Sequence, residues 1–234
     1  MTARLPALAL AVAVLASPAA AQEPLAPTRL APVVVTPARL EQTSGEAPAS
    51  VTVLTRDDVR ESAAQTVDDL LRQVPGFSLF RRTSSVVAHP TAQGLSLRGI
   101  GPSGTSRALV LLDGVPVNDP FGGWIYWSRV PLQAIEQIEV VRGGGSSVWG
   151  NYALGGVVHV ITRRPTQRAA LFETSYGTHD TMNFDLLLTE AQGPLRLSLE
   201  GNYFDTGGYK VVRDSRRGSI DIDADSRHST FNGR

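Results

Sequence analysis

The sequence predicts an α+β domain, with a small mixed sheet and short helices, followed by the first strands of a transmembrane antiparallel β-barrel that these residues do not complete. Three observations predict this architecture. Short apolar runs rich in β-branched residues recur between Ser50 and Thr162, each bounded by glycine or charge. Two patterns that begin helices, at Thr55 and Thr66, lie among them. After Arg163, longer segments alternate apolar and polar residues, as strands of a membrane barrel do.

The composition argues against several classes of protein. The 234 residues include 22 basic and 22 acidic residues, whereas a nucleic-acid-binding protein normally carries a basic face. The sequence contains no cysteine, which excludes disulfides, thiolate metal sites and a cysteine nucleophile. It also contains neither the G-x-S-x-G motif of serine hydrolases nor the H-E-x-x-H motif of zinc hydrolases, so we expect no enzyme and no catalytic residues.

The first 21 residues have the three parts of a signal peptide. Arg4 supplies a positive charge, residues 5–16 are apolar, and three alanines at 19–21 form a small-residue cleavage site before Gln22. The apolar part is too short to span a membrane as a helix. We therefore predict export with residues 1–21 as the signal peptide, the alternative being a frayed apolar N-terminus.

Residues 22–48 are rich in proline, alanine and threonine and predict a flexible linker. One island of β-branched residues interrupts it: Val33, Val34, Val35 and Thr36. Such a segment can add as a strand to the edge of a partner's sheet, where backbone hydrogen bonds supply affinity. The alternatives are a chance apolar cluster or a strand that lies on the following domain.

The α+β domain is predicted at residues 49–165. Residues 50–55 alternate apolar and polar side chains and predict a half-buried strand. The capping patterns at Thr55 and Thr66 each predict a short helix. The second helix should bury apolar side chains spaced three and four residues apart and should end at Pro75-Gly76. Those side chains are Val67, Leu70, Leu71 and Val74. Residues 77–93 predict a strand and then a loop.

The centre of the sheet is predicted at residues 108–112, 138–141 and 157–162, which are apolar and β-branched. Asp113-Gly114 predicts a tight hairpin turn, because glycine adopts a positive φ without steric cost. A short helix is predicted at residues 131–135. Gly143, Gly144 and Gly145 lack the following lysine of a phosphate-binding loop and are better explained by a tight turn with close backbone approach.

No metal or cofactor site is expected. His89 has no histidine or acid near it in the sequence, so a solvated loop histidine is preferred to a metal ligand. Three alternating aspartates, Asp221, Asp223 and Asp225, suggest calcium. However, Ser226 and Asn232 stand where an EF-hand needs glycine and glutamate, so solvated carboxylates are preferred.

An unusual concentration of aromatic residues lies at Trp124, Tyr126 and Trp127. Aromatic rings with polar tips suit an exposed recognition loop. Two interpretations stay open: the rings contact a substrate, or they pack inside the domain or against a barrel wall.

Residues 166–234 predict three barrel strands and the start of a fourth. The apolar-face positions are Ala170, Phe172, Thr174 and Tyr176, then Phe184, Leu186 and Leu188, then Leu195, Leu197, Leu199 and Tyr203. Short turns are predicted at 177–178 and 191–194, and a long polar loop at 205–226. Because the smallest such barrels use about 8 strands, we expect the N-terminal fragment of a longer protein.

Four pieces of the sequence occur in a characteristic order. They are LRG at 97–99, VLLDGVPV at 110–117, IEQIEVVRG at 135–143 and YALGGVVHVIT at 152–162. In this order they resemble the plug domain of TonB-dependent outer-membrane receptors, and a looser resemblance runs from Val33 to the C-terminus. The resemblance implies a cell outer-membrane barrel of about 22 strands with a plug inside it.

The resemblance also implies roles for named residues. Val33–Thr36 would be the TonB box, captured by the energy-coupling protein TonB of the inner-membrane complex. Arg98 and Arg142 would latch the plug to glutamates on the barrel's inner wall, the alternative being surface arginines without such a duty. Plug loops touch substrate in the family, so Trp124, Tyr126 and Trp127 are candidate contacts.

The implied cargo is an iron chelate first, then cobalamin or haem, and no residue decides among them. A non-functional truncated fragment is a further alternative. A receptor that also signals to an anti-sigma factor is disfavoured, because residues 22–32 leave no room for the extra domain of such members. The valine-rich box and the two arginines argue against an adhesin or a passive porin.

Overall fold

The computed structural model describes residues 33–34, 41–43, 49–81, 83–89, 91, 93–100 and 106–234. The chain divides into two units, residues 1–30 and 31–234, and the described residues all belong to the second. The predicted signal peptide lies outside the described residues, as do Val35 and Thr36 of the predicted TonB box.

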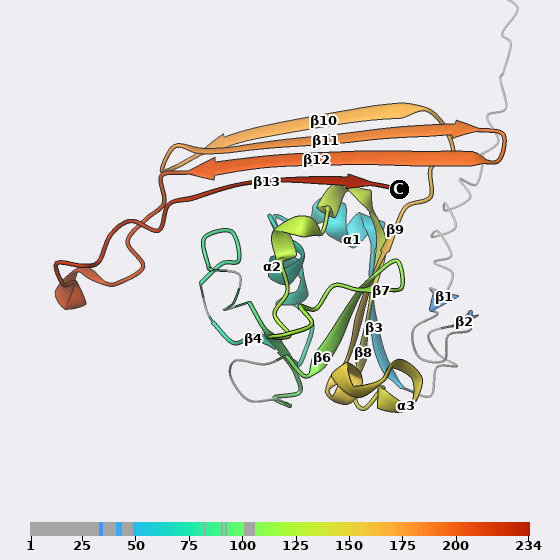
Figure 1. Ribbon diagram of the computed structural model, residues 1–234, viewed down its shortest axis with the longest axis horizontal. Coiled ribbons are helices and arrows are strands. Elements are labelled where there is room, and N and C mark those ends of the chain that lie inside the picture. Colours follow the sequence, from blue (N-terminus) through green and yellow to red (C-terminus); the bar gives the residue numbers. More distant parts are fainter. Residues whose placement is uncertain are drawn as a thin grey trace, which may run out of the picture. The chain divides into compact units, whose positions relative to one another are not determined.

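A five-stranded mixed sheet forms the centre of residues 50–162 (Figure 1). Its strands, in sheet order, are β3 (Ser50–Thr55), β8 (Ile135–Arg142), β9 (Gly156–Thr162), β6 (Ala108–Leu112) and β7 (Val115–Pro116). Neighbouring strands are antiparallel except for β6 and β9, which are parallel. The predicted mixed sheet is confirmed, but β8 begins at Ile135, because only Leu132–Ala134 forms a 3₁₀ turn where a helix was expected.

The predicted hairpin turn between β6 and β7 is confirmed. Asp113 has a φ of 49° and Gly114 a φ of 84°, the pair of positive values that a type I′ turn requires. The close backbone approach predicted at Gly143, Gly144 and Gly145 is found instead at Gly156, where an added Cβ would lie 2.3 Å from the carbonyl oxygen of Val141. At Gly144 and Gly145 the nearest backbone oxygens would lie 4.0 and 3.6 Å from an added Cβ. The segment from Gly143 to Gly155 is more than a turn, since it contains a short helix and a 3₁₀ turn.

The helices of this domain are short. They are α1 (Arg56–Glu61), α2 (Val67–Leu71) and α3 (Ser146–Trp149). At α1 the predicted capping box forms, since Asp58 accepts the N–H of Thr55 at 2.7 Å while the Thr55 hydroxyl accepts that of Asp58 at 3.4 Å. At α2 the predicted box is wrong: the Thr66 hydroxyl donates to the Asp69 side chain and accepts no backbone N–H. None of the described helices is long and apolar enough to cross a membrane.

Shorter elements complete the domain. They are β1 (Val33–Val34) with β2 (Gln42–Thr43), β4 (Phe77–Leu79) with β5 (Leu95–Leu97), and 3₁₀ turns at Trp127–Arg129 and Asn151–Leu154. The hydrophobic core lies between the helices and the sheet and contains the α2 side chains predicted to be buried, together with Trp127 and the apolar side chains of β6, β8 and β9.

Residues 169–233 form a separate antiparallel sheet of four strands in chain order. These are β10 (Ala169–Gly177), β11 (Thr181–Gln192), β12 (Leu195–Thr206) and β13 (Ser226–Gly233). The sheet is open, with β10 and β13 at its edges. A 3₁₀ turn at Asp214–Arg216 lies in the long loop before β13.

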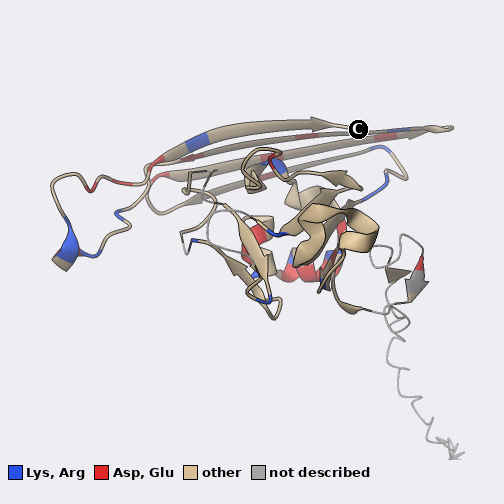
Figure 2. Cartoon of the chain, turned by 60° about the horizontal axis from the view of Figure 1, so that its bottom comes forward, with Lys and Arg blue, Asp and Glu red and all other residues tan. Residues whose placement is uncertain are grey.

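The two faces of this sheet differ as the alternation predicts. On one face the cross-strand pairs Phe172–Leu186 and Leu188–Leu199 expose apolar side chains to the surroundings. On the other, Glu200 and Ser198 are buried and Asn202 is half-buried. The strands carry few charged residues along their length, whereas the loop after β12 carries both signs (Figure 2). An exposed apolar face backed by a polar one is the pattern of a membrane barrel wall.

Candidate functional site

The described part of the candidate TonB box is a short strand held against the domain. Val33 and Val34 pair antiparallel with Thr43 and Gln42, and the side chain of Val34 is fully buried. The amide of Gln137 on β8 donates to the carbonyl oxygen of Val33 at 3.1 Å. This placement of Val33 and Val34 matches the alternative in which the segment lies on the domain.

The structure brings together the two arginines from distant motifs. The backbone N–H of Arg98 donates to the carbonyl oxygen of Gly76 at 2.7 Å, and Arg142 Nη1 donates to that of Pro75 at 3.1 Å. The Arg98 guanidinium also lies beside Gly143, where an added Cβ would come within 3.8 Å of Arg98 Nη1. Both residues therefore meet at the Pro75-Gly76 turn.

The environments of the two arginines differ. Arg98 is exposed, whereas Arg142 is half-buried and donates through Nη2 to the Thr52 hydroxyl at 3.1 Å. Neither forms an ion pair with a carboxylate among the described residues. The latch to a barrel glutamate therefore stays a prediction.

The three aromatic candidates do not share one environment. Trp127 is fully buried in the core, which is the packing alternative. Trp124 and Tyr126 are half-buried, and the Arg129 guanidinium lies 4.4 Å from the centre of the Tyr126 ring. Only Trp124 and Tyr126 thus present part of their surface to a ligand.

Phe121 begins the same aromatic segment and was not among the three candidate contacts, yet its side chain is the one that the structure exposes. Its side chain is 96% exposed, at the tip of a turn that Asp119 organises. The Asp119 carboxylate accepts the N–H groups of Phe121 and Gly122, both at 2.9 Å, and its own N–H donates to the carbonyl oxygen of Trp124 at 2.8 Å. The turn therefore presents Phe121 in a fixed position, and the aspartate two residues before it is the sequence signal for such a turn.

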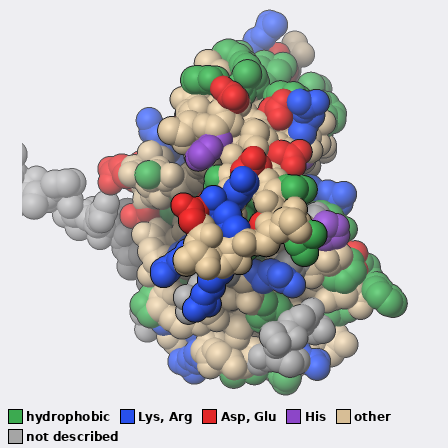
Figure 3. Space-filling model, turned by 90° about the vertical axis from the view of Figure 1, so that its left-hand side faces the viewer, with side chains coloured by type: hydrophobic (Ala, Val, Ile, Leu, Met, Phe, Trp, Pro, Cys, Tyr) green, Lys and Arg blue, Asp and Glu red, His purple; other side chains and the backbone are tan. Residues whose placement is uncertain are grey.

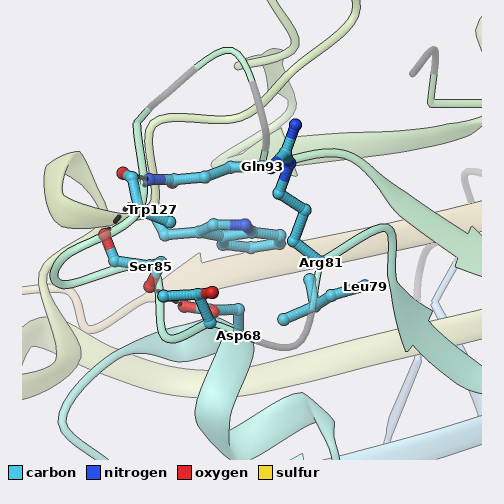
Figure 4. A pocket seen from close by; sticks show the side chains of 8 residues that line it. Asp68, Leu79, Arg81, Ser85, Gln93 and Trp127 are labelled. Carbon is cyan, nitrogen blue, oxygen red and sulfur yellow. Dashed lines mark hydrogen bonds between the residues drawn. The ribbon is translucent and has the colours of Figure 1, made fainter. Parts of the chain in front are cut away.

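A small cavity lies beneath this segment, next to Trp127 (Figure 4). The indole of Trp127 lies between the side chains of Gln93 and Asp68. The Ser85 hydroxyl donates to Asp68 Oδ1 at 2.5 Å, and Gln93 Nε2 donates to the carbonyl oxygens of Ser85 at 3.1 Å and Ala88 at 2.8 Å. These bonds hold the loop after β4 against the core.

Asp68 is the buried ionisable group of this cluster. Burial raises the pKa of its carboxyl, and hydrogen bonds from Ser85 and Thr66 lower it less than burial raises it. Asp68 Oδ2 has no hydrogen-bond partner among the described residues, and neither does Trp127 Nε1. No local pattern in the sequence marks this cluster, because Ser85 lies 17 residues from Asp68.

Replacing Asp68 with asparagine is expected to stabilise the domain at neutral pH. The pKa of the Asp68 carboxyl is higher in the folded protein than its ordinary value of 3.8, so as pH rises the carboxyl loses its proton first in the unfolded chain. The free energy of unfolding therefore falls between pH 3.8 and the pKa of the folded state. Asparagine keeps an oxygen for the Ser85 hydroxyl and removes this loss. The measurement is chemical unfolding followed by tryptophan fluorescence between pH 3 and 8.

Asp69→Asn is the control, because Asp69 is partly exposed and pairs with Arg72 at 3.4 Å, a contact worth about 0–1 kcal/mol. An unfolding midpoint for Asp68→Asn below that of the parent at pH 7 contradicts the assignment.

Among the described residues, no group of three or more histidine, aspartate or glutamate side chains is placed to hold a metal ion.

Comparison with known protein families identifies the domain. The family model described as the TonB-dependent Receptor Plug Domain matches residues 43–157. These residues belong to the plug-domain family of TonB-dependent receptors. The five-stranded sheet and its helices are therefore a plug domain, and the exposed apolar face of the following sheet is that of a barrel wall.

Solved structures of such receptors share this fold. The receptor FpvA of P. aeruginosa bound to heterologous pyoverdines has a TM-score of 0.59 and 20% identity over 76% of this chain. The siderophore receptor PirA from Pseudomonas aeruginosa has a TM-score of 0.53 and 25% identity over 80% of this chain. PirA from Acinetobacter baumannii also has a TM-score of 0.53, with 26% identity over 70% of this chain. The matches cover 23%, 32% and 26% of those proteins, so this chain spans about a quarter to a third of their length.

Proposed function

We propose that this chain is the N-terminal part of an outer-membrane receptor that imports an iron chelate by energised displacement of its plug. The observation that carries the proposal is a plug domain followed directly by strands with an exposed apolar face. The similarity to PirA, a siderophore receptor, favours an iron chelate over the other cargoes of the family. Haem and cobalamin are the alternatives, and no catalytic role is proposed.

Binding is assigned to the turn that carries Phe121 and to its half-buried neighbours Trp124 and Tyr126. Aromatic surface held in a preformed turn contacts a ligand at little entropic cost. Trp127 is assigned a supporting role, because its ring is fully buried beneath them. The sequence pattern predicted one role, substrate contact, for Trp124, Tyr126 and Trp127, whereas this proposal keeps that role only for Trp124 and Tyr126.

The charged residues of the loop between β12 and β13 do not favour a cargo of either sign. The loop between β12 and β13 carries four cationic residues within eight positions: Lys210, Arg213, Arg216 and Arg217. Seen from this side of the molecule, Lys and Arg side chains lie close to Asp and Glu side chains (Figure 3). Arg217 pairs with Asp214 at 2.5 Å, and Asp221, Asp223 and Asp225 follow in the same loop, so the loop carries no net charge that would attract an anion.

Energy coupling is assigned to Val33–Thr36 as the TonB box. In this proposal TonB adds its own strand to the segment that now pairs with Gln42–Thr43, and pulling transmits force to the plug. The Gln137 contact to Val33 is then one of the bonds to be broken first. The latch by Arg98 and Arg142 belongs to the same proposal.

The test is uptake by iron-starved cells that express the receptor from its own gene. We expect accumulation of radiolabelled ferric siderophore that stops when the proton-motive force is collapsed, and none when the gene is deleted. A panel of ferric siderophores, haem and cobalamin identifies the cargo. Uptake of cobalamin or haem alone overturns the iron-chelate assignment, and energy-independent uptake overturns the coupling.

A further inference from the structure

The carboxylate of Asp113 joins two parts of the plug. Asp113 stands at the turn between β6 and β7, and its Oδ1 accepts the backbone N–H of Thr162 at 2.8 Å. Its Oδ2 accepts the Thr162 hydroxyl at 2.7 Å. Thr162 is the last residue of β9, from which the chain continues to the wall strand β10. The carboxylate therefore ties the hairpin turn to the point at which the chain leaves the plug.

A guanidinium from the wall sheet reaches the same carboxylate. Arg234 Nη1 donates to Asp113 Oδ2 at 2.8 Å, and Nη2 donates to Glu200 Oε1. Backbone hydrogen bonds of 2.9 Å in both directions pair Arg234 with Ser198 on β12, which places its side chain on the polar face with Glu200. Arginine suits this bridge, because its planar fork can serve two carboxylates at once.

The bridge is only partly shielded from water, and Glu200 is its one buried member. The side chains of Arg234, Asp113 and Glu200 are 28%, 33% and 5% exposed. Burial alone would raise the pKa of Asp113, but the hydrogen bonds from Thr162 and Arg234 together hold it below its ordinary value. Two further contacts join the same surfaces: Gln133 to Glu173 at 2.9 Å, and Asn232 to the carbonyl oxygen of Arg129 at 3.3 Å.

We propose that Asp113, Arg234 and Glu200 form an ionic anchor that fixes the β6–β7 turn of the plug to the polar face of the wall and must open before the plug moves. The anchor rests on the proposed function, since only a plug that is displaced needs one. It is distinct from the Arg98 and Arg142 pair, which lies at the Pro75-Gly76 turn. In the anchor the wall supplies the cation and the plug the acid, the reverse of the predicted latch.

The test is hydrogen–deuterium exchange of residues 111–117 in the receptor, expressed from its own gene and purified in detergent. Asp113→Asn removes the charge, and asparagine tolerates the left-handed backbone at this position. Arg234→Lys keeps a cation for the buried Glu200 but loses the fork. Loss of a charge-assisted hydrogen bond of this kind changes the equilibrium between closed and open states by about a factor of ten or more. We therefore expect roughly tenfold faster exchange of residues 111–117 in each variant.

The double variant is expected to exchange no faster than either single variant, because both remove the same contact. Arg227→Lys is the control, since its ion pair with Asp205 at 2.8 Å lies within the wall strands. Unchanged exchange in Arg234→Lys, or additive effects in the double variant, overturns the anchor. If ferric-chelate uptake is absent in the parent receptor but the exchange pattern holds, the proposed function fails and the contact itself stands.

Discussion

Replacing Val34 with proline is expected to abolish energised uptake of the ferric chelate and to leave chelate binding unchanged. Addition of a strand to TonB requires backbone N–H groups of the box, and proline has none. The chelate-binding residues assigned above lie elsewhere in the plug, at Phe121, Trp124 and Tyr126. The measurements are accumulation of radiolabelled chelate by energised cells and equilibrium binding to the same cells when de-energised.

Two variants separate loss of the TonB contact from loss of the strand pair that holds the box. Gln42→Pro perturbs the pairing of β1 with β2 from the other strand but leaves the box intact, so uptake should persist. Val34→Ile keeps the backbone donor and should behave as the parent. Uptake at the parent rate by Val34→Pro refutes the box assignment, and equal losses in Val34→Pro and Gln42→Pro show that only the local strand pair matters.

Replacing Gly156 with alanine is expected to prevent the plug from folding. Gly156 has a φ of 139°, and an added Cβ would lie 2.3 Å from the carbonyl oxygen of Val141 and 2.7 Å from Leu97 Cδ1. The backbone of β8 cannot move aside without breaking its pairing with β9. Strain at such a backbone position costs about 1–3 kcal/mol, and overpacking costs a similar amount again, out of a total stability of about 5–15 kcal/mol for a domain.

The measurement is the amount of receptor in outer membranes, together with sensitivity to a large antibiotic that the plug normally excludes. We expect little intact receptor for Gly156→Ala. Gly144→Ala is the matched control, because its added Cβ would meet only the carbonyl oxygen of Leu154, at 4.0 Å, and its φ is not positive. Parent-like amounts of Gly156→Ala would show that β8 and β9 can separate more easily than their pairing indicates.

The overall architecture could be read from the sequence because its signals are local. The Asp113-Gly114 turn, the Thr55 cap and the alternation in residues 169–206 each depend on residues within a few positions of one another. The capping box at Thr66 failed for the opposite reason. Its hydroxyl also contacts Ser85, which lies 19 residues away, and a local pattern contains no information about such a partner.

The candidate site divides in the same way. The motifs identified Arg98, Arg142 and the aromatic segment, and the family match to residues 43–157 supports the plug in which they lie. Which aromatic ring is buried depends on the packing of α2 and the loop after β4 around Trp127, and that packing assembles residues from four separate elements. Asp68 stood out only in the structure for this reason, whereas the Asp119 turn that exposes Phe121 is a local feature of the sequence.

By itself the sequence determined the order of elements, the position of the plug, the apolar face of the wall strands and the family. These follow from periodicity, turn chemistry and motif order, which residues close in the chain specify. Only the tertiary structure decided that Arg98 and Arg142 meet at Pro75-Gly76, that Trp127 is internal and that Asp113 contacts Arg234 across 121 residues. Each of these depends on sheet order and packing, which bring together side chains whose separation in the chain carries no signal.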